Sequence, residues 1–379
     1  MHADPVIIAA RRTPIGTRGR GLSDVTLDRL GAAAVTAALA DAAAVTGAAP
    51  AVTDVVWGNC MGPGGNPGRI TALAAGLGHD VPGGTVDRQC GSGLAAVLDA
   101  VTAARVDPGV RVAGGAESPS TAPVRAFDGV AYDRAPFAPL GFADPDMPRA
   151  ADDLARHDGI SRERQDAYAA RSHARAIEAR DAGRFDAELV PVAGLDHDDS
   201  IGHAAPLLPR LRPLFAGGTV TAGTATRISD GAAAIVVAPG GAAPGLAVRG
   251  GAIVGCDPAL PGVGAAVAVR TLLDRHGLTV ADIAAFEIVE AFAAQTLAVL
   301  DRLALALADD DPRVCADGGA LGFSGAAGAS SAASGVIFTI ETQWVISARS
   351  RRTATGSAPS AYCAPSSFSA AAASPRRII

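Results

Sequence analysis

One cysteine lies in a turn that suits a nucleophile. Residues 86–94 read VDRQCGSGL, so Cys90 falls between a short apolar run and a helix predicted over Gly93–Val106. The unpaired N–H groups and dipole of a helix N-terminus favour a thiolate, so we expect a lowered pKa at Cys90. Glycines 91 and 93 leave room for a substrate beside the sulfur. A buried, merely packed cysteine is the alternative, but the turn favours a nucleophile that forms a covalent intermediate.

A second group of polar residues has the donor types of a metal site. Its members are Asp196, His197, Asp198, Asp199 and His203. They lie in a polar stretch without the helical spacing that would gather their side chains around one ion. We therefore interpret the stretch as a solvated loop and predict no metal.

Strands and helices alternate around Cys90. We predict strands at Val6–Ala10, Asp54–Gly58 and Arg111–Gly115, and helices over Thr26–Ala40 and Gly93–Val106. This alternation predicts an α/β fold with a mostly parallel sheet covered on both faces.

The rest of the chain has three parts. Residues 118–217 are more polar, and a helix is expected over Ser161–Ala182, capped by Ser161. From about Ser324 the chain becomes rich in Ala, Ser and Arg, and we do not expect Thr353–Ile379 to build a core. Between these parts the alternation resumes, with strands predicted at Ala232–Ala238, Ala247–Val254 and Ala285–Glu290, and helices at Gly264–Arg275 and Ala291–Leu307.

Composition excludes several classes of protein. The 379 residues are 49% hydrophobic but only 4% aromatic, which is typical of a globular α/β protein with an aliphatic core. The net charge of −6 argues against nucleic-acid binding and against an anionic membrane surface. Every Lys/Arg position is Arg, so Schiff-base chemistry on a lysine is excluded.

The five cysteines form no CxxC pair, which argues against a disulfide framework or a structural zinc site. The apolar run Val6–Ala10 is too short for a signal peptide, and Pro239, Pro244 and Arg249 interrupt the longest apolar tract. We therefore expect no transmembrane helix and a cytoplasmic location.

Several segments in one order resemble landmarks of the thiolases, the acyl-CoA C-acyltransferases. The resemblance covers about residues 4–330. Besides the turn around Cys90, it rests on VIIAARRTPIG (6–16), WGNCMGPGGNPGRITALAAGLG (57–78), AGGAES (113–118), GISRERQDAYAARSHARA (159–176), GGTVTAGTATRISDGAAA (217–234), VEAFAAQ (289–295) and VCADGGAL (314–321).

The resemblance implies a five-layer α-β-α-β-α fold of two similar βαβαβαββ halves with an inserted loop domain. The N-terminal half would be residues 1–117, the CoA-binding loop domain 118–217, and the C-terminal half 218–379, atypical from about 324. It implies that Cys90 carries an acyl group between acyl-CoA and coenzyme A or a second acyl-CoA. Coenzyme A is then a substrate and product, with no permanently bound cofactor, and the protein a homodimer or homotetramer.

Three catalytic positions depart from the family pattern. Val289 stands where thiolases have an Asn that holds a water in an oxyanion hole, and Gly325 where they have the His that activates the nucleophile. Cys363 is the one candidate for the second cysteine, without the family's glycine loop. General acid–base help contributes about 10² to 10⁴ in rate, and one oxyanion donor about 10² to 10³, so these changes bear on turnover.

The resemblance also implies residues for the coenzyme. Met147 matches a loop-domain methionine that lines the acyl pocket. Thr226 keeps the hydroxyl of the family's Ser, whereas Arg227 replaces a Gly where pantetheine passes.

Two functional hypotheses follow. The first is an active thiolase-type acyltransferase with a substituted base. The second is a catalytically impaired thiolase-fold protein that binds CoA thioesters or partners. The abrupt change near Ser324 is typical of a shifted reading frame, which would account for the second.

Overall fold

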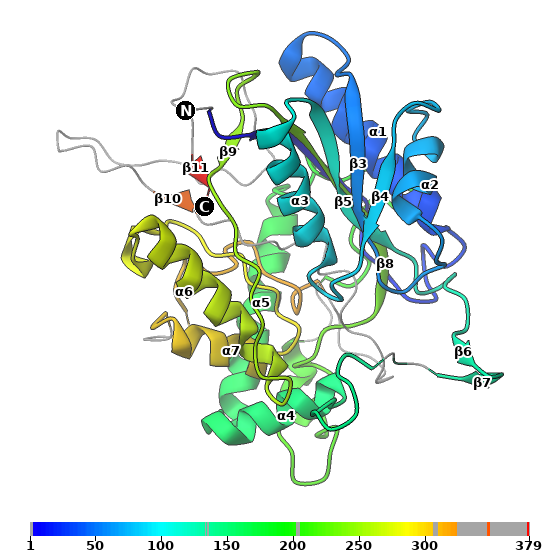
Figure 1. Ribbon diagram of the computed structural model, residues 1–379. Helices are drawn as coiled ribbons and strands as arrows, with labels where there is room; N and C mark the ends of the chain where they lie inside the picture. The colour runs from blue at the N-terminus through cyan, green and yellow to red at the C-terminus, as the bar shows by residue number, and fades with distance from the viewer. Residues whose placement is uncertain are drawn as a thin grey trace.

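A mixed β-sheet with helices on both faces dominates the N-terminal part of the chain (Figure 1). The computed structural model describes residues 3–132, 134, 136–201, 205–305, 310–323, 347–348 and 377–378. The strands are β1 Val6–Arg12, β2 Gly16–Thr17, β3 Val52–Gly58, β4 Gly83–Val86, β5 Val110–Glu117, β6 Ala126–Phe127, β7 Val130–Ala131, β8 Ser229–Ala238, β9 Leu246–Val248, β10 Ser347–Ala348 and β11 Arg377–Ile378. The helices are α1 Leu27–Thr46, α2 Pro67–Ala74, α3 Ser92–Val106, α4 Met147–Asp158, α5 Arg162–Asp181, α6 Gly264–His276 and α7 Ala293–Arg302, with 3-10 turns η1 Ala205–Arg210, η2 Pro261–Val263 and η3 Val280–Asp282.

The sheet runs in the order β10-β11-β9-β1-β8-β5-β3-β4, with β2 paired to β8. Strands β4, β3 and β5 are parallel neighbours. The prediction of a mostly parallel sheet is wrong, because β8 pairs antiparallel with both β5 and β1, and β1 pairs antiparallel with β9. The short strand β11 pairs parallel with β9.

Alternate residues of the strands face two different apolar layers. Val112 of β5 packs in the layer formed with α1 and α2, whereas its neighbour Ala113 packs in the layer formed with α3. Val236 and Val237 of β8 divide in the same way. Because successive strand residues point to opposite faces, an aliphatic strand buried on both sides needs no polar alternation.

The layer between α3 and the sheet is thin at the end that carries Cys90. A Cβ built on Gly58, the last residue of β3, would lie 2.5 Å from the backbone nitrogen of Gly93 in α3. Real Cβ atoms do not approach backbone so closely, so this contact requires a glycine at position 58. The contact sets the first turn of α3 directly on the carboxyl end of β3.

The four helices α4, α5, α6 and α7 share a second core with residues from the turns between them. Its largest buried side chains include Tyr168, Phe286, Ile288 and Leu297. The more polar segment after residue 118 is therefore packed against the last part of the described chain rather than standing apart from it. The short hairpin β6–β7 extends away from both cores (Figure 1).

Three predicted elements of the second half differ in the structure. The strand predicted at Ala247–Val254 is limited to β9, because Gly250 and Gly251 follow it without side chains to pack. The strand predicted at Ala285–Glu290 is wrong: in the described chain, Phe286 forms a single bridge, to Val314. The last predicted helix is shorter and begins at Ala293, whose N–H bonds the Thr224 carbonyl instead.

Helix α1 is the candidate membrane span among the described residues, by length and apolar composition. Its buried residues, such as Leu30, Ala34 and Ala38, pack against the sheet. A core helix of a soluble domain passes the same test, so its packing accounts for its composition.

We predict that Gly58→Ala destabilises the protein by about 1–3 kcal/mol, because the added methyl group forces the first turn of α3 away from β3. Urea unfolding measures this change. Gly84→Ala, in the neighbouring strand, is the control because a Cβ there meets nothing within 4 Å. Equal free energies of unfolding for the two variants would contradict the proposed contact.

Candidate active site

Three chemically active side chains gather where parallel strands end. Cys60 lies two residues after β3, Cys90 four residues after β4, and Glu117 is the last residue of β5. Because β4, β3 and β5 are adjacent and parallel, their carboxyl ends meet at one edge of the sheet. Ligand sites of α/β sheets form outside this edge.

The turn before α3 holds Cys90 in an exposed position. Gln89 has a positive φ of 52°, which a non-glycine residue seldom adopts. Ser92 braces the turn, because its hydroxyl accepts the Arg88 N–H at 2.8 Å and donates to the Gln89 carbonyl at 2.6 Å. The sharp turn therefore presents the Cys90 thiol at the N-terminal end of the helix.

The pKa of Cys90 is opposite to the expectation from its helix position. The protein that surrounds the thiol removes water from a thiolate and raises the pKa to about 11, although the side chain still reaches solvent. Its own backbone N–H lowers the value, and the negative charge of Glu117 raises it further. Desolvation outweighs the helix N-terminus here, so Cys90 is a neutral thiol at pH 7.

Glu117 is a buried carboxyl beside the nucleophile turn. It is 2% exposed and accepts N–H groups from Cys60 at 2.5 Å, Met61 at 3.2 Å and the Asn59 side chain at 2.7 Å. Burial raises its pKa to about 8, and the charge of Asp87 adds to the rise, while the hydrogen bonds from Cys60 and Met61 oppose it. The group is therefore shared between its acid and base forms near neutral pH.

Two predicted site segments lie side by side. The Thr226 N–H donates to the Ala291 carbonyl at 3.0 Å, and the Ala293 N–H donates to the Thr224 carbonyl at 2.9 Å. Thr226, expected at the coenzyme, is buried next to the segment that carries Val289. Val289 is partly buried, and its side chain has no donor for an oxyanion.

Arg227 is half-buried at the end of this segment. Burial lowers the pKa of its guanidinium, the charge of Arg20 lowers it further, and Asp199 opposes both. His173 of α5 is fully buried nearby, and burial lowers its pKa to about 4, with the charge of Arg227 acting in the same direction. His173 is therefore a neutral imidazole at pH 7.

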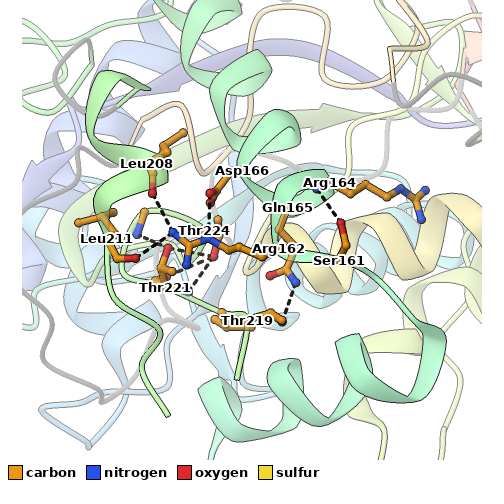
Figure 2. A network of polar contacts seen from close by, with 12 residues as sticks. Ser161, Arg162, Arg164, Gln165, Asp166, Leu208, Leu211, Thr219, Thr221 and Thr224 are labelled. Atoms are coloured by element: carbon orange, nitrogen blue, oxygen red, sulfur yellow. Dashed lines mark hydrogen bonds and ion pairs between the residues drawn. The ribbon is translucent and has the colours of Figure 1, made fainter. Parts of the chain in front are cut away.

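A polar network fixes the chain before Thr226 (Figure 2). Arg162, at the start of α5, pairs with Asp166 at 2.8 Å and donates to the carbonyls of Leu208 and Leu211 at 2.8 and 2.9 Å. Gln165, three residues further along α5, donates to Thr219 at 2.9 Å. These bonds tie α5 to η1 and to the turn that leads to residues 224–227. Met147, by contrast, begins α4 and packs against the second core.

The acidic stretch is structural. Asp198 is buried and accepts hydrogen bonds from both terminal N–H groups of Arg12, at 2.7 and 2.9 Å. It also accepts the Ile15 N–H at 2.8 Å. Asp199 accepts the N–H and hydroxyl of Thr17. The prediction of a solvated loop is thus wrong for Asp198, and among the described residues no group of His, Cys, Asp or Glu can hold a metal ion. His203, like Gly325 and Cys363, lies outside the described residues.

The sequence profile of the thiolase N-terminal domain matches residues 5–240, and that of the thiolase C-terminal domain matches residues 244–360. The chain belongs to the thiolase family. It is 36% identical to the 3-ketoacyl-CoA thiolase of Cronobacter sakazakii over 351 residues, which cover 86% of this chain and 89% of that enzyme. The corresponding Erwinia tasmaniensis enzyme is 38% identical with the same coverage.

The fold of this thiolase is shared with a solved relative. The Bacillus anthracis acetyl-CoA acetyltransferase superposes with a TM-score of 0.78 at 30% identity, covering 89% of this chain and 90% of that one. The predicted α/β, thiolase-like fold class is therefore confirmed. Thiolase-type acyl transfer is the enzyme class of the family to which the chain belongs.

Sequence reasoning missed Glu117, Cys60 and His173. Glu117 and Cys60 each end or follow an apolar strand that was predicted, and their position at a common sheet edge was the available signal. His173 gave no such signal, because its helical position alone does not say which buried segment it faces.

We predict that Cys90 reacts slowly with iodoacetamide at pH 7. At a pKa of about 11 only about one thiol in 10⁴ is ionised there, and the rate should rise about tenfold per pH unit toward pH 11. Peptide mass spectrometry separates Cys90 from Cys256, which is also exposed. A rate that levels off near pH 8 or below would show that the helix N-terminus dominates after all.

Proposed function

We propose that this thiolase takes an acyl group from acyl-CoA onto Cys90 and passes it to coenzyme A or to a second acyl-CoA. The observation that carries the proposal is the exposed Cys90 thiol at the N-terminal end of α3, on the carboxyl edge of three parallel strands. A thioester on Cys90 divides the transfer into two steps, each with a thiol or carbanion as partner.

The departures at two family positions bear on rate rather than on the type of reaction. Val289 donates nothing to an oxyanion, and the loss of one such donor lowers the rate about 10² to 10³. Gly325 carries no base. We therefore propose a slow acyltransferase whose nucleophile is activated by another group.

We propose that coenzyme A binds as substrate and product beside residues 224–227, without a permanently bound cofactor. Support comes from the bonds that fix this segment against Ala291–Ala293 and, through α5, against Thr219. Arg227 presents a half-buried cation there, which suits the phosphates of coenzyme A. Met147 is proposed at the acyl pocket on the resemblance of its position.

We also propose that the chain self-associates as a homodimer or homotetramer, through an apolar arm within residues 124–142. Exposed apolar side chains gather on this arm: Val124, Phe127, Val130, Tyr132, Phe137, Leu140 and Phe142. Phe127 is 75% and Leu140 103% exposed. So many exposed large apolar groups on one projecting segment mark an association surface.

A cytoplasmic location is the last part of the proposal. It is supported by the described cysteines, Cys60, Cys90, Cys256 and Cys315, which form no disulfide, as is usual in a reducing compartment. Nucleic acid and membrane are not proposed as partners, because the chain carries a net charge of −6.

Acyl transfer to Cys90 is tested by intact-protein mass spectrometry after incubation with acetyl-CoA. We expect one added acetyl group, because Cys90 is exposed and lies at the end of α3 where a thioester can approach. Cys90→Ser should lose the adduct, and Cys256→Ser is the control because Cys256 is exposed but lies outside this edge. No adduct on the folded wild-type protein would favour the impaired thiolase-fold protein instead.

Self-association is tested by light scattering of Leu140→Asp and Phe127→Asp. Wild type should have a mass that is a multiple of 37.6 kDa, and the variants a smaller one, because a buried unpaired carboxylate opposes the contact. Val106→Asp, at an 83% exposed apolar residue of α3, is the control and should keep the wild-type mass. A monomeric wild type would contradict the proposed surface.

A further inference from the structure

The Cys90 thiol needs a proton acceptor that the sequence positions of the family do not supply. Val289 has no acid–base group, and Gly325 has no side chain to take a proton. Because the pKa of Cys90 is raised to about 11, its attack on a thioester at neutral pH depends on removal of the proton during the attack.

Glu117 is a carboxyl at the same sheet edge as Cys90. It ends β5, while Cys90 follows β4, and β3 lies between them. Its charge acts on the Cys90 thiol and is one cause of that thiol's raised pKa. The two groups therefore interact across the end of β3.

The position of the Glu117 carboxyl is fixed from the side of β3. Both oxygens accept hydrogen bonds, one from the Cys60 N–H and the other from Met61 and the Asn59 side chain. The Cys60 thiol also donates to Glu117. The turn after β3 has further hydrogen bonds of its own. The Asn59 side-chain oxygen accepts the Gly62 N–H at 3.2 Å, and the Asn59 backbone N–H donates to the Val86 carbonyl at 3.1 Å.

We propose that Glu117 is the acid–base group of Cys90, accepting its proton during acyl transfer and returning it to the departing thiol. The inference rests on the proposed acyl transfer to Cys90. It assigns the role of the missing histidine to a carboxyl in the AGGAES segment, to which the resemblance gave no catalytic role.

The Cys90 sulfur forms a bond to the thioester carbonyl carbon, and its proton passes to the Glu117 carboxylate, in direct contact or through one water. The carbon–sulfur bond of the donor thioester then breaks, and the departing thiolate takes the proton from Glu117. The products are acyl-Cys90, a free thiol and the original carboxylate.

The charged and titratable groups around Glu117 come from each neighbouring segment. The hydrogen bonds of Cys60 and the charge of Asp87 shift the pKa of Glu117, and the charge of Glu117 in turn raises the pKa of Cys90. The Arg125 guanidinium donates to the Cys60 carbonyl. Burial is the largest influence on Glu117 and raises its pKa to about 8, so near neutral pH the group can both accept and donate a proton.

The test compares two reactions of Cys90 in Glu117→Gln. Alkylation by iodoacetamide reports the thiolate, and at pH 9, where Glu117 is ionised, it should rise about two- to tenfold because a repelling charge is lost. Acylation by the acetyl thioester of N-acetylcysteamine needs the proton acceptor and should fall about 10² to 10⁴-fold. Asp99→Asn removes the same charge from an exposed position on α3 and should change neither rate.

The pH dependence gives a second readout. Wild-type acylation should rise with pH and level off above about pH 8, where Glu117 is ionised, whereas Glu117→Gln should continue to rise toward pH 11 with the thiolate. Glu117→Asp keeps a carboxyl one methylene shorter, so it should lose about tenfold in acylation and less than Glu117→Gln. If Glu117→Gln does not fold, as judged by the loss of cooperative unfolding, the comparison is made with Glu117→Asp instead.

Two results would overturn the assignment. One is a change of acylation and alkylation in the same direction in Glu117→Gln, which would make the carboxyl a structural or purely electrostatic neighbour. The other is equal acylation by wild type and Glu117→Asp. The small thioester needs no coenzyme site, so failure of acetyl-CoA alone to acylate wild type would count against the proposed function and not against Glu117.

Discussion

The contact between the end of β3 and the first turn of α3 is the constraint on which the site depends. Gly58 and Gly93 bring two backbones closer than any Cβ permits, and a Cβ on Gly115 of β5 would likewise meet the Gly58 carbonyl at 2.7 Å. Glycines in β3, α3 and β5 thus keep side chains away from the carboxyl edge of the sheet. The side chains at this edge are therefore those at or just after the strand ends, such as Cys60, Cys90 and Glu117.

The same close packing determines the electrostatics of that edge. Backbone and side chains crowd around Cys90 and Glu117, so water is displaced and the charged form of each group is disfavoured. The helix N-terminus and the N–H groups of Cys60 and Met61 offset only part of this effect. The resting site is thus a neutral thiol beside a carboxyl that changes its proton near neutral pH, and charge develops as the thiol reacts.

The second core depends on polar ties as much as on apolar packing. The buried Glu290 carboxyl accepts the hydroxyls of Tyr168 and Ser172 at 2.8 and 2.6 Å and the Leu321 N–H at 3.1 Å. One side chain thus joins α5 to the segment before α7 and to the end of the described core. These bonds hold the segment of Val289 against α5 where the predicted strand at 285–290 forms no ladder.

The sequence by itself determined the elements of the first half and the place of Cys90. Val6–Ala10, Asp54–Gly58 and Gly93–Val106 were predicted close to their observed bounds, because a strand buried on both faces is a short apolar run and an amphipathic helix repeats its apolar residues at a period of about 3.6. The family landmarks determined the fold class, since they occur in one order along the chain.

Only the tertiary structure decided the electrostatics and the neighbours. The pKa of Cys90 follows from protein brought in from β3 and β5, which local sequence does not specify, so the helix position predicted the wrong direction. The direction of β8, the burial of Asp198 against Arg12 and the meeting of Glu117 with Cys60 likewise join residues far apart in the chain. Period and motif describe a residue's own segment, whereas charge and solvation depend on all the segments that fold around it.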